Sequence, residues 1–525
     1  MSNQQWIERN RQYTLTDPES GFTFAAAGMK FTPEQLQSLS GKLAAAHQEM
    51  LKLEAGAVKN PDENRKVTHF TDRIHYTESS LFHDVEVFAA AVSKGEVTGS
   101  TGKKFESAVI NGIGGSALGP QLMQFAVNGP YWNERSDAER HGYLKIYFLD
   151  NTDSAEFADL IQVIDPETTL VVNISKSGGT QETKNNAAAL QDFFKSKNVD
   201  FAPHFTAITM KDSSLDRQAH SEKWLRIFDM AESIGGRTSE TSIVGHLPAA
   251  LTGIDFKSFI DGACAMDRWT RNPGMMENPA YFMAALWYIA GGGKGDRNLV
   301  IVPYSDRLIL LSRYFQQLIM ESLGKELDLD GNVVHQGLNV FGNKGGTDAH
   351  AFIQQLNDGR DDFFVTFIEV LKNAMPLPVG ENMDMGNYLH GFLAGLSSAL
   401  RSKGRQVMQI TISEINPYNL GMIIALYERT VAVYAELIHI NAFHQPGVQA
   451  YKLAAKGILD LRAKVIAAVS SSNGISGTAA EIAAAIGMAD DEVEIAGLFD
   501  KSSANCDYVS RAWDSERKTW IYTIK

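Results

Sequence analysis

Residues 169–183 read TLVVNISKSGGTQET, and this stretch decides the fold class. Its first six residues, Thr169–Ile174, form a mostly apolar and β-branched run, which is typical of a strand buried inside a parallel sheet. A loop rich in serine and glycine follows at Ser175, and a helix opens in the polar segment after it. A buried strand, a glycine-rich loop and a helix in direct succession indicate a βα unit of an α/β protein.

The same alternation of short apolar runs and longer periodic segments continues on both sides of this stretch. It predicts a first set of strands at Ser107–Ile110, Lys145–Leu149, Thr169–Ile174 and Phe205–Met210, with Leu225–Phe228 as a candidate fifth. After a glycine spacer at 291–295 it predicts a second set at Asn298–Pro303, Gly337–Val340, Phe363–Glu369 and Gln406–Ile412. The two sets favour an α/β fold of two tandem doubly wound, mainly parallel sheets; one large mixed sheet is the alternative.

The sequence divides into four predicted segments. Residues 1–104 form an N-terminal helical segment, 105–275 a first sheet domain, 276–470 a second sheet domain with a C-terminal helix, and 471–525 a small acidic appendage without an assigned role. Residues 470–474, SSSNG, are predicted to be a linker. Two short helices predicted at Thr478–Ile486 and Asp491–Phe499 could mimic a helix-turn-helix, but their acidic residues would repel phosphates, which argues against DNA reading.

The composition is that of a globular protein. The chain has 525 residues, of which 44% are hydrophobic and 21% charged, and 48 Lys and Arg against 62 Asp and Glu give a net charge of −14. This charge argues against nucleic-acid binding through a basic surface. Two cysteines are too few for a disulfide framework, the first residues lack a signal peptide, and no long apolar window predicts a membrane helix. We therefore expect a cytoplasmic protein without a membrane partner.

The loop Ser175–Thr183 (SKSGGTQET) carries the strongest binding signal. Hydroxyls and backbone amides can surround the oxygens of a phosphate monoester, glycines permit close approach, and the following helix start adds partial positive charge. The alternative is a Ser/Thr-rich helix cap. A second glycine-rich loop, Asn111–Ser116, also lies between a strand and a helix, but it lacks the spacing of ATP-binding and dinucleotide-binding loops and could be only a tight connection.

Further along the chain, three segments contain residues suited to acid–base chemistry. Arg237, after two glycines, could stabilise negative charge on an oxygen, although a loop arginine is usually solvated. Glu321 lies four residues after Gln317 on one helix face and could remove a proton next to a carbonyl; a surface role is the alternative. His350 follows a glycine-rich turn and could equally be a packing residue, and the sequence gives it no metal partner.

Taken together, these segments resemble the glucose-6-phosphate isomerase (phosphoglucose isomerase) family over residues 60 to 455 or so. Residues 60–69 (NPDENRKVTH) resemble the family's Asn-x-x-Glu-x-Arg-x-x-x-His segment. In family order there follow the Gly-Gly-Ser loop, the Ser-Lys-Ser loop, Gly-Gly-Arg, Met-Glu-Ser-x-Gly-Lys, His-Ala-Phe and Asn-x-Phe-x-Gln-x-Gly-Val. The resemblance implies two sugar-isomerase sheets and the interconversion of glucose 6-phosphate and fructose 6-phosphate in glycolysis and gluconeogenesis.

The resemblance also implies roles for individual residues. Glu321 would be the base that moves a proton through an enediol(ate), Arg237 would offset the negative charge, and His350 and Lys452 would serve ring opening. The substrate-binding residues implied are Ser116, Ser175, Lys176, Ser177, Thr180, Glu182, Gly236, Gln317 and Gln445. The family implies no metal and no cofactor, and a homodimer in which His350 enters the partner's active site.

Three departures from the family pattern limit what the resemblance implies about substrate range. Gly178-Gly179 stands where many members have Phe-Thr, Leu323 where many have Asn, and Ala349 where many have Gln. An isomerase that acts on both glucose 6-phosphate and mannose 6-phosphate is therefore an alternative. A sugar-phosphate sensor is the alternative from another class, but it would need only the phosphate loop and none of the acid–base residues.

Overall fold

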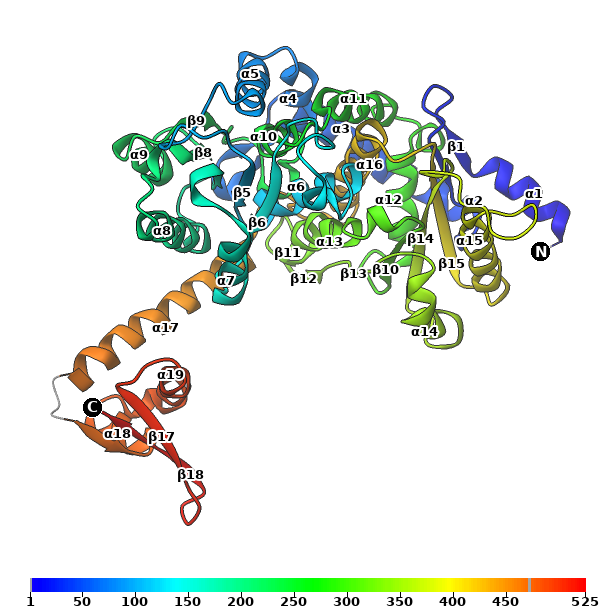
Figure 1. Ribbon diagram of the computed structural model, residues 1–525. Coiled ribbons are helices and arrows are strands. Elements are labelled where there is room, and N and C mark those ends of the chain that lie inside the picture. The colour runs from blue at the N-terminus through cyan, green and yellow to red at the C-terminus, as the bar shows by residue number, and fades with distance from the viewer. Residues whose placement is uncertain (1, 471–473) are drawn as a thin grey trace. The chain divides into compact units, whose positions relative to one another are not determined.

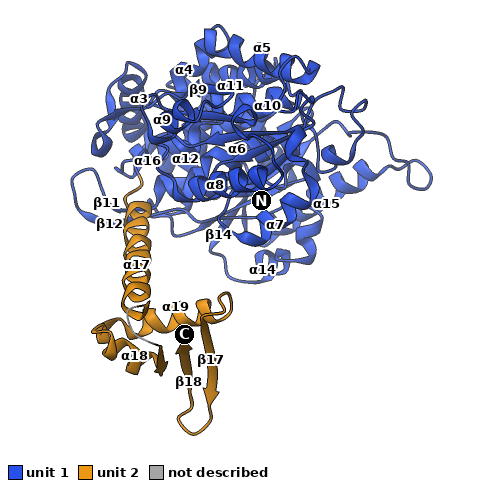
Figure 2. Cartoon of the chain, turned by 60° about the vertical axis from the view of Figure 1, so that its left-hand side comes forward, with its two compact units in different colours: residues 1–444 blue, residues 445–525 orange. Residues whose placement is uncertain are grey.

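The computed structural model describes residues 2–470 and 474–525, and these fall into two units, Met1–His444 and Gln445–Lys525. Figure 2 distinguishes the two units by colour. Residues 471–473 of the predicted linker lie outside the described residues. The predicted boundaries at 104/105, 275/276 and 470/471 stay predictions.

The first sheet has five parallel strands in the order β6-β5-β7-β8-β9. Its strands are β5 (Ser107–Asn111), β6 (Lys145–Leu149), β7 (Thr169–Ile174), β8 (Phe205–Thr209) and β9 (Arg226–Asp229). The central strands β5, β7 and β8 are buried along their whole length, as both faces of a parallel sheet covered by helices require. The candidate fifth strand is thus confirmed at the edge of the sheet.

The second sheet has six strands in the order β1-β2-β15-β14-β10-β13. Its parallel part consists of β10 (Asn298–Pro303), β13 (Val340–Phe341), β14 (Phe363–Val370) and β15 (Gln406–Ile412). The hairpin of β1 (Thr14–Thr16) and β2 (Thr23–Ala25) adds two antiparallel strands beside β15. The two-sheet prediction is confirmed, whereas two details differ. The strand expected at Gly337–Val340 begins only at Val340, and the N-terminal hairpin was not predicted.

Helices fill the chain between these strands. The N-terminal helices are α1 (Asn3–Gln12), α2 (Pro33–Ser38), α3 (Ser40–Glu54), α4 (His69–Tyr76) and α5 (Ser80–Lys94). Those between the strands of the first sheet and in the middle of the chain are α6 (Gly115–Val127), α7 (Ser154–Val163), α8 (Gln181–Ser196), α9 (Ser214–Ser221), α10 (Ile243–Leu251), α11 (Phe256–Thr270) and α12 (Pro279–Ala290). The second sheet is accompanied by α13 (Leu311–Phe315), α14 (Ile353–Asp358), α15 (Met385–Ser402) and α16 (Pro417–Leu437).

Helix α16 forms the centre of the first unit. Figure 1 shows it between the two sheets, with β5 and β6 on one side and β14 and β15 on the other. It packs against α3, α11 and α12, and every residue from 419 to 435 is buried. A helix buried on all sides must pair its charged side chains, because an isolated buried charge is very costly.

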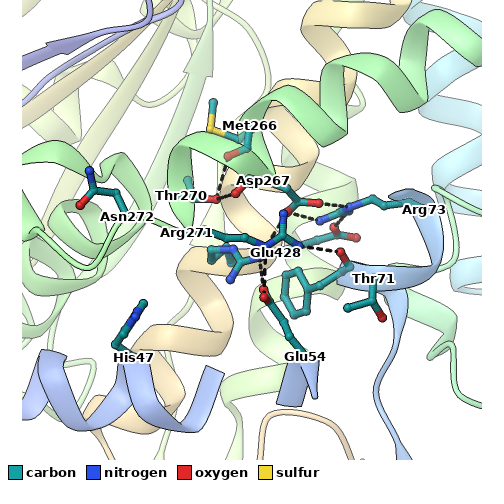
Figure 3. A network of polar contacts seen from close by, with 12 residues as sticks. His47, Glu54, Thr71, Arg73, Met266, Asp267, Thr270, Arg271, Asn272 and Glu428 are labelled. Atoms are coloured by element: carbon teal, nitrogen blue, oxygen red, sulfur yellow. Dashed lines mark hydrogen bonds and ion pairs between the residues drawn. The ribbon is translucent and has the colours of Figure 1, made fainter. Parts of the chain in front are cut away.

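Glu428 and Arg429 of α16 belong to a buried ionic network, drawn in Figure 3. Arg73 of α4 donates two hydrogen bonds to Asp267 of α11, at 2.6 and 2.8 Å, and a third to Glu428 of α16. Next along α16, Arg429 donates to Glu54 of α3 at 2.7 Å. Burial raises the pKa of the Glu428 carboxyl to about 7 despite the neighbouring Arg73. The network therefore ties the N-terminal helices to the centre of the unit.

The second unit has a hydrophobic core of its own, which includes Val465, Ile482, Ile495, Phe499 and Tyr522. A long helix, α17 (Pro446–Ser470), precedes an antiparallel sheet in the order β16-β18-β17, and two short helices lie between its strands. The bounds are β16 (Ile475–Gly477), α18 (Ala479–Ala485), α19 (Glu492–Ser503), β17 (Val509–Asp514) and β18 (Thr519–Ile524). The sequence predicted both short helices but not the sheet.

None of the helices in residues 2–470 and 474–525 is both long and apolar enough to span a membrane.

Replacing Arg73 by Met is expected to lower the free energy of unfolding by about 3–5 kcal/mol, because Asp267 and Glu428 would remain buried without their partner. Arg268→Met, at an exposed position of α11 next to Asp267, is the control and should cost no more than about 0.5 kcal/mol. Denaturant unfolding followed by tryptophan fluorescence checks both. Equal midpoints for the two variants would show that the network does not stabilise the fold.

Candidate active site

The two glycine-rich loops predicted from the sequence meet at the carboxyl edge of the first sheet. The chain runs from β5 outward to β6 and returns to β7 on the other side of β5, so β5 and β7 flank the point where the winding direction reverses. Ligands of doubly wound sheets bind in the crevice at such a point. Gly112–Ser116 follows β5, and Ser175–Thr180 follows β7.

The loop after β7 has a compact backbone that only glycine allows at one position. Gly178 has a φ of +66°, and a Cβ there would lie 2.2 Å from the backbone nitrogen of Leu215. Ser175 Oγ donates to Thr180 Oγ1 at 3.2 Å, and Ser177 Oγ accepts from the backbone N–H of Gly179 at 3.2 Å. Thr180 is the N-cap of α8 but its hydroxyl makes no capping hydrogen bond within the described chain, so this helix start can face an anion.

Lys176 connects this loop to the segment before Arg237. Its Nζ donates to the carbonyl oxygen of Ile234 at 2.9 Å and to that of Glu232. Burial, with a contribution from Arg65, lowers the pKa of Lys176 to about 8. A cation held this way supplies positive charge beside the serine hydroxyls, which suits an anionic ligand.

The loop after β5 lies against two other predicted site segments. A Cβ at Gly115 would lie 1.9 Å from the carbonyl oxygen of Gly236, and one at Gly114 would lie 3.0 Å from Gln317 Nε2. Only residues without side chains permit this approach. Gln317 Oε1 is buried and has no hydrogen-bond partner among the described residues. The Gly-Gly-Ser loop, Gly-Gly-Arg turn and Gln317 therefore form one site, with Ser116 partly exposed in the first turn of α6.

At the centre of this site, Arg237 is paired with Glu321. Arg237 is in the short helix η5 (Gly236–Thr238), and its Nη1 donates to Glu321 Oε1 at 2.6 Å. Its Nη2 donates to the carbonyl oxygens of Ala442, at 2.6 Å, and His444, at 3.2 Å. Burial lowers the pKa of the Arg237 guanidinium, and Glu321 opposes this shift. Within the described chain Glu321 Oε2 accepts no hydrogen bond, which leaves this oxygen available for a proton.

The helix that carries Glu321 changes from α-helical to π-helical winding at Gln316. After α13 the chain forms a π-helix, η8 (Gln316–Glu321), in the segment where the sequence predicted a helix. Short π-helical segments inside α-helices occur frequently at functional sites. Their wider turn changes the direction of the side chains. Gln317 and Glu321, four residues apart, both lie in this segment of altered winding, which Glu321 ends.

Several residues of the site were not predicted individually from the sequence. Lys325 is buried, with 4% of its surface exposed, and donates to the carbonyl oxygen of Glu321. His444 Nδ1 lies 3.4 Å from Asp62 Oδ2, and Arg65 donates to the carbonyl oxygens of Ser233 and Phe443. These residues lie within the quoted motifs, so the signal was present, but nothing in the sequence distinguishes a buried lysine from an exposed one.

The remaining predicted residues are placed differently. His350 ends η9 (Thr347–His350) and is exposed, while its neighbour Asp348 is buried and accepts from the backbone of Asn343 and Lys344. Glu182 is partly exposed in the first turn of α8. Gln445 and Lys452 belong to the second unit, and both are exposed. Gln445 directly precedes helix α17, and Lys452 lies near the start of that helix. Among the residues that the structure describes, no three His, Cys, Asp or Glu side chains are grouped to hold a metal ion.

Comparison with known proteins agrees with this geometry. The family model of phosphoglucose isomerase matches residues 34–406 and 401–476. The chain belongs to the phosphoglucose isomerase family. A glucose-6-phosphate isomerase of Geobacter sulfurreducens is 42% identical over 516 residues, 95% of each chain. One of Nostoc punctiforme is 44% identical over 452 residues, 84% of each chain. A crystal structure of a glucose-6-phosphate isomerase from Chlamydia trachomatis superposes with a TM-score of 0.77 at 27% identity, covering 87% of this chain and 91% of the other.

Gly178→Ala should weaken the binding of a phosphorylated sugar acid roughly tenfold or more, because an alanine would strain the left-handed backbone and collide with Leu215. Gly179→Ala is the control: its Cβ would meet only the movable Ser177 Oγ, at 3.3 Å. Titration calorimetry measures both affinities. Unchanged affinity in Gly178→Ala would mean that this loop does not hold the phosphate.

Proposed function

We propose that this chain interconverts glucose 6-phosphate and fructose 6-phosphate, the reaction named in its relatives, as a step of glycolysis and gluconeogenesis in the cytoplasm. Aldose–ketose isomerisation moves a proton between neighbouring carbons through an enediol(ate). The groups needed are one base that both removes and returns the proton and a cation for the charge that develops on oxygen. The Arg237–Glu321 pair, at 2.6 Å in a largely buried site, is the observation that carries this proposal.

In the proposed reaction, Glu321 Oε2 takes the proton from one sugar carbon and returns it to the next. Arg237 keeps its position through the carbonyl oxygens of Ala442 and His444, so its charge is fixed before the enediolate forms. Gln317, whose buried Oε1 has no partner among the described residues, would bind a sugar hydroxyl at the reacting end. Gly236, exposed at the edge of the turn, would offer its backbone there.

The phosphate of the sugar would bind to the loop after β7. Ser175, Ser177 and Thr180 supply hydroxyls, Lys176 supplies charge, and the start of α8 supplies backbone amides. Ser116 and Glu182, at the starts of the two neighbouring helices, would make accessory contacts. Holding the phosphate at a distance from the reacting carbons places the sugar against Glu321, so binding energy contributes to the chemical step.

Ring opening would use His350 and Lys452, with Gln445 as an accessory contact, and this part of the proposal rests on the family resemblance. We propose a homodimer in which His350 serves the partner's site. The exposed position of His350 supports this arrangement. So does a group of exposed apolar side chains on the segment before α15 and on α15 itself: Met375, Leu377, Met383, Met385, Tyr388 and Phe392. A Cβ at Gly346 would lie 3.8 Å from Leu389 of α15, so α15 adjoins the turn that carries His350.

Two alternatives are tested by substrate assays. A sugar-phosphate sensor needs the phosphate loop but has no use for a carboxylate held by a buried arginine, so the Arg237–Glu321 pair favours an enzyme. A dual specificity for mannose 6-phosphate is compatible with the same groups. Coupled assays of the purified protein with fructose 6-phosphate, glucose 6-phosphate and mannose 6-phosphate distinguish these possibilities.

Glu321→Gln should lower kcat by about a thousandfold or more while the affinity for phosphorylated sugars is retained, because the amide keeps the shape but cannot take the proton. Glu326→Gln, at an exposed position in the strand that follows, is the matched control and should behave as the wild type. Steady-state kinetics measures both. Near-normal turnover of Glu321→Gln would refute the assignment of the base.

The shared site predicts complementation between two inactive chains. One chain lacking Glu321 and another lacking His350 each form homodimers with damaged sites, whereas a mixed dimer has one intact site. With random pairing, half of the dimers are mixed, so co-expression should restore roughly a quarter of wild-type activity. Purified mixed dimers that are no more active than the single variants would place His350 in its own chain's site.

A further inference from the structure

Lys325 is a buried lysine that contacts the backbone of the proposed base. It follows Glu321 by four residues and begins β11 (Lys325–Leu327), which pairs with β12 (Val333–Gln336) in a two-stranded ladder. Only 4% of its surface is exposed, although lysine is among the residue types least often buried. A lysine in this position needs a structural or chemical reason.

The contact that Lys325 makes explains its place. Its Nζ donates to the backbone carbonyl oxygen of Glu321 at 2.7 Å. In a continuing helix that carbonyl would accept from the backbone N–H four residues later. Here the helix ends and the chain leaves as a strand, so the ammonium group at the same sequence distance takes over the hydrogen bond. The peptide of the base is thus anchored by a side chain rather than by the helix.

The electrostatic surroundings show that this placement is costly. Burial, with a contribution from Arg237, lowers the pKa of Lys325 to about 7, and Glu321 opposes the shift. His444 also faces this group: burial, with a contribution from Lys325, lowers the pKa of the His444 imidazole, and Asp62 opposes that shift. Strongly perturbed groups of this kind concentrate at functional sites, where the cost is offset by function.

We propose that Lys325 is a positioning residue for Glu321: it holds the base's peptide at the end of the π-helix and so fixes the carboxylate against Arg237 and the substrate. This inference rests on the proposed function. Arg237 Nη1 donates to the carboxylate oxygen Oε1 of Glu321 at 2.6 Å, and Lys325 Nζ donates to the backbone carbonyl oxygen of the same residue at 2.7 Å. With both hydrogen bonds in place, the backbone and the carboxylate of Glu321 are each held in position. Proton transfer between two adjacent carbons requires a carboxylate with such a fixed position.

Lys325→Met, which keeps the apolar stem and removes the donor, tests the proposal. We expect kcat to fall roughly tenfold to a hundredfold, because small displacements of a catalytic group have effects of this size. KM should change less than about threefold, since the phosphate loop is untouched. Lys325→Arg keeps N–H donors and a positive charge and should retain more turnover than Lys325→Met. Lys257→Met, an exposed lysine paired with Asp261 on α11, is the matched control and should leave both constants unchanged.

The proposal is overturned if Lys325→Met keeps kcat within about twofold of the wild type, if its loss lies in KM rather than kcat, or if Lys325→Arg is no better than Lys325→Met. Should Lys325→Met fail to fold, Lys325→Leu, which also lacks a donor, is measured against the same limits. Failure of the proposed function gives a different result, since the wild type would then show no isomerase activity, or Glu321→Gln would be as active as the wild type.

Discussion

The ion pair between Arg237 and Glu321 is the interaction on which the site depends. Arg237 lies beyond the last strand of the first sheet, and Glu321 lies on the helix that follows the first parallel strand of the second. Neither sheet alone brings a guanidinium to a carboxylate. The two sheets pack on either side of the buried helix α16, and Arg237 Nη1 then lies 2.6 Å from Glu321 Oε1. This contact therefore depends on the fold of the whole first unit.

Placing charges in such a site requires a rigid surrounding, because a buried ion pair is favourable only when its geometry is held. The structure supplies this with backbone carbonyl oxygens. Those of Ala442 and His444 accept from Arg237, that of Ile234 accepts from Lys176, and that of Glu321 accepts from Lys325. The cations of the site are thus oriented before any substrate is bound, which is the condition for stabilising charge in a transition state.

The sequence predicted the strands and loops that are specified by neighbouring residues. The predicted strands Lys145–Leu149 and Asn298–Pro303 agree with the structure to the residue, because a short apolar run bounded by polar residues is visible in neighbouring positions of the sequence. The β1–β2 hairpin was missed because its three-residue strands are specified by pairing with β15, far along the chain. The site motifs were found for the same reason as the strands, whereas the burial of Lys325 depends on tertiary packing that no local pattern contains.

Proton transfer by Glu321 can be followed by proton NMR of the reaction in deuterated water. A carboxyl group that carries the proton between two carbons exchanges it with solvent during the enediolate lifetime. Wild-type protein acting on fructose 6-phosphate should therefore place deuterium at C2 of the glucose 6-phosphate formed, and Glu321→Gln should place none. Full conversion without any deuterium in product or remaining substrate, or equal labelling by Glu321→Gln, would show that Glu321 does not transfer the proton.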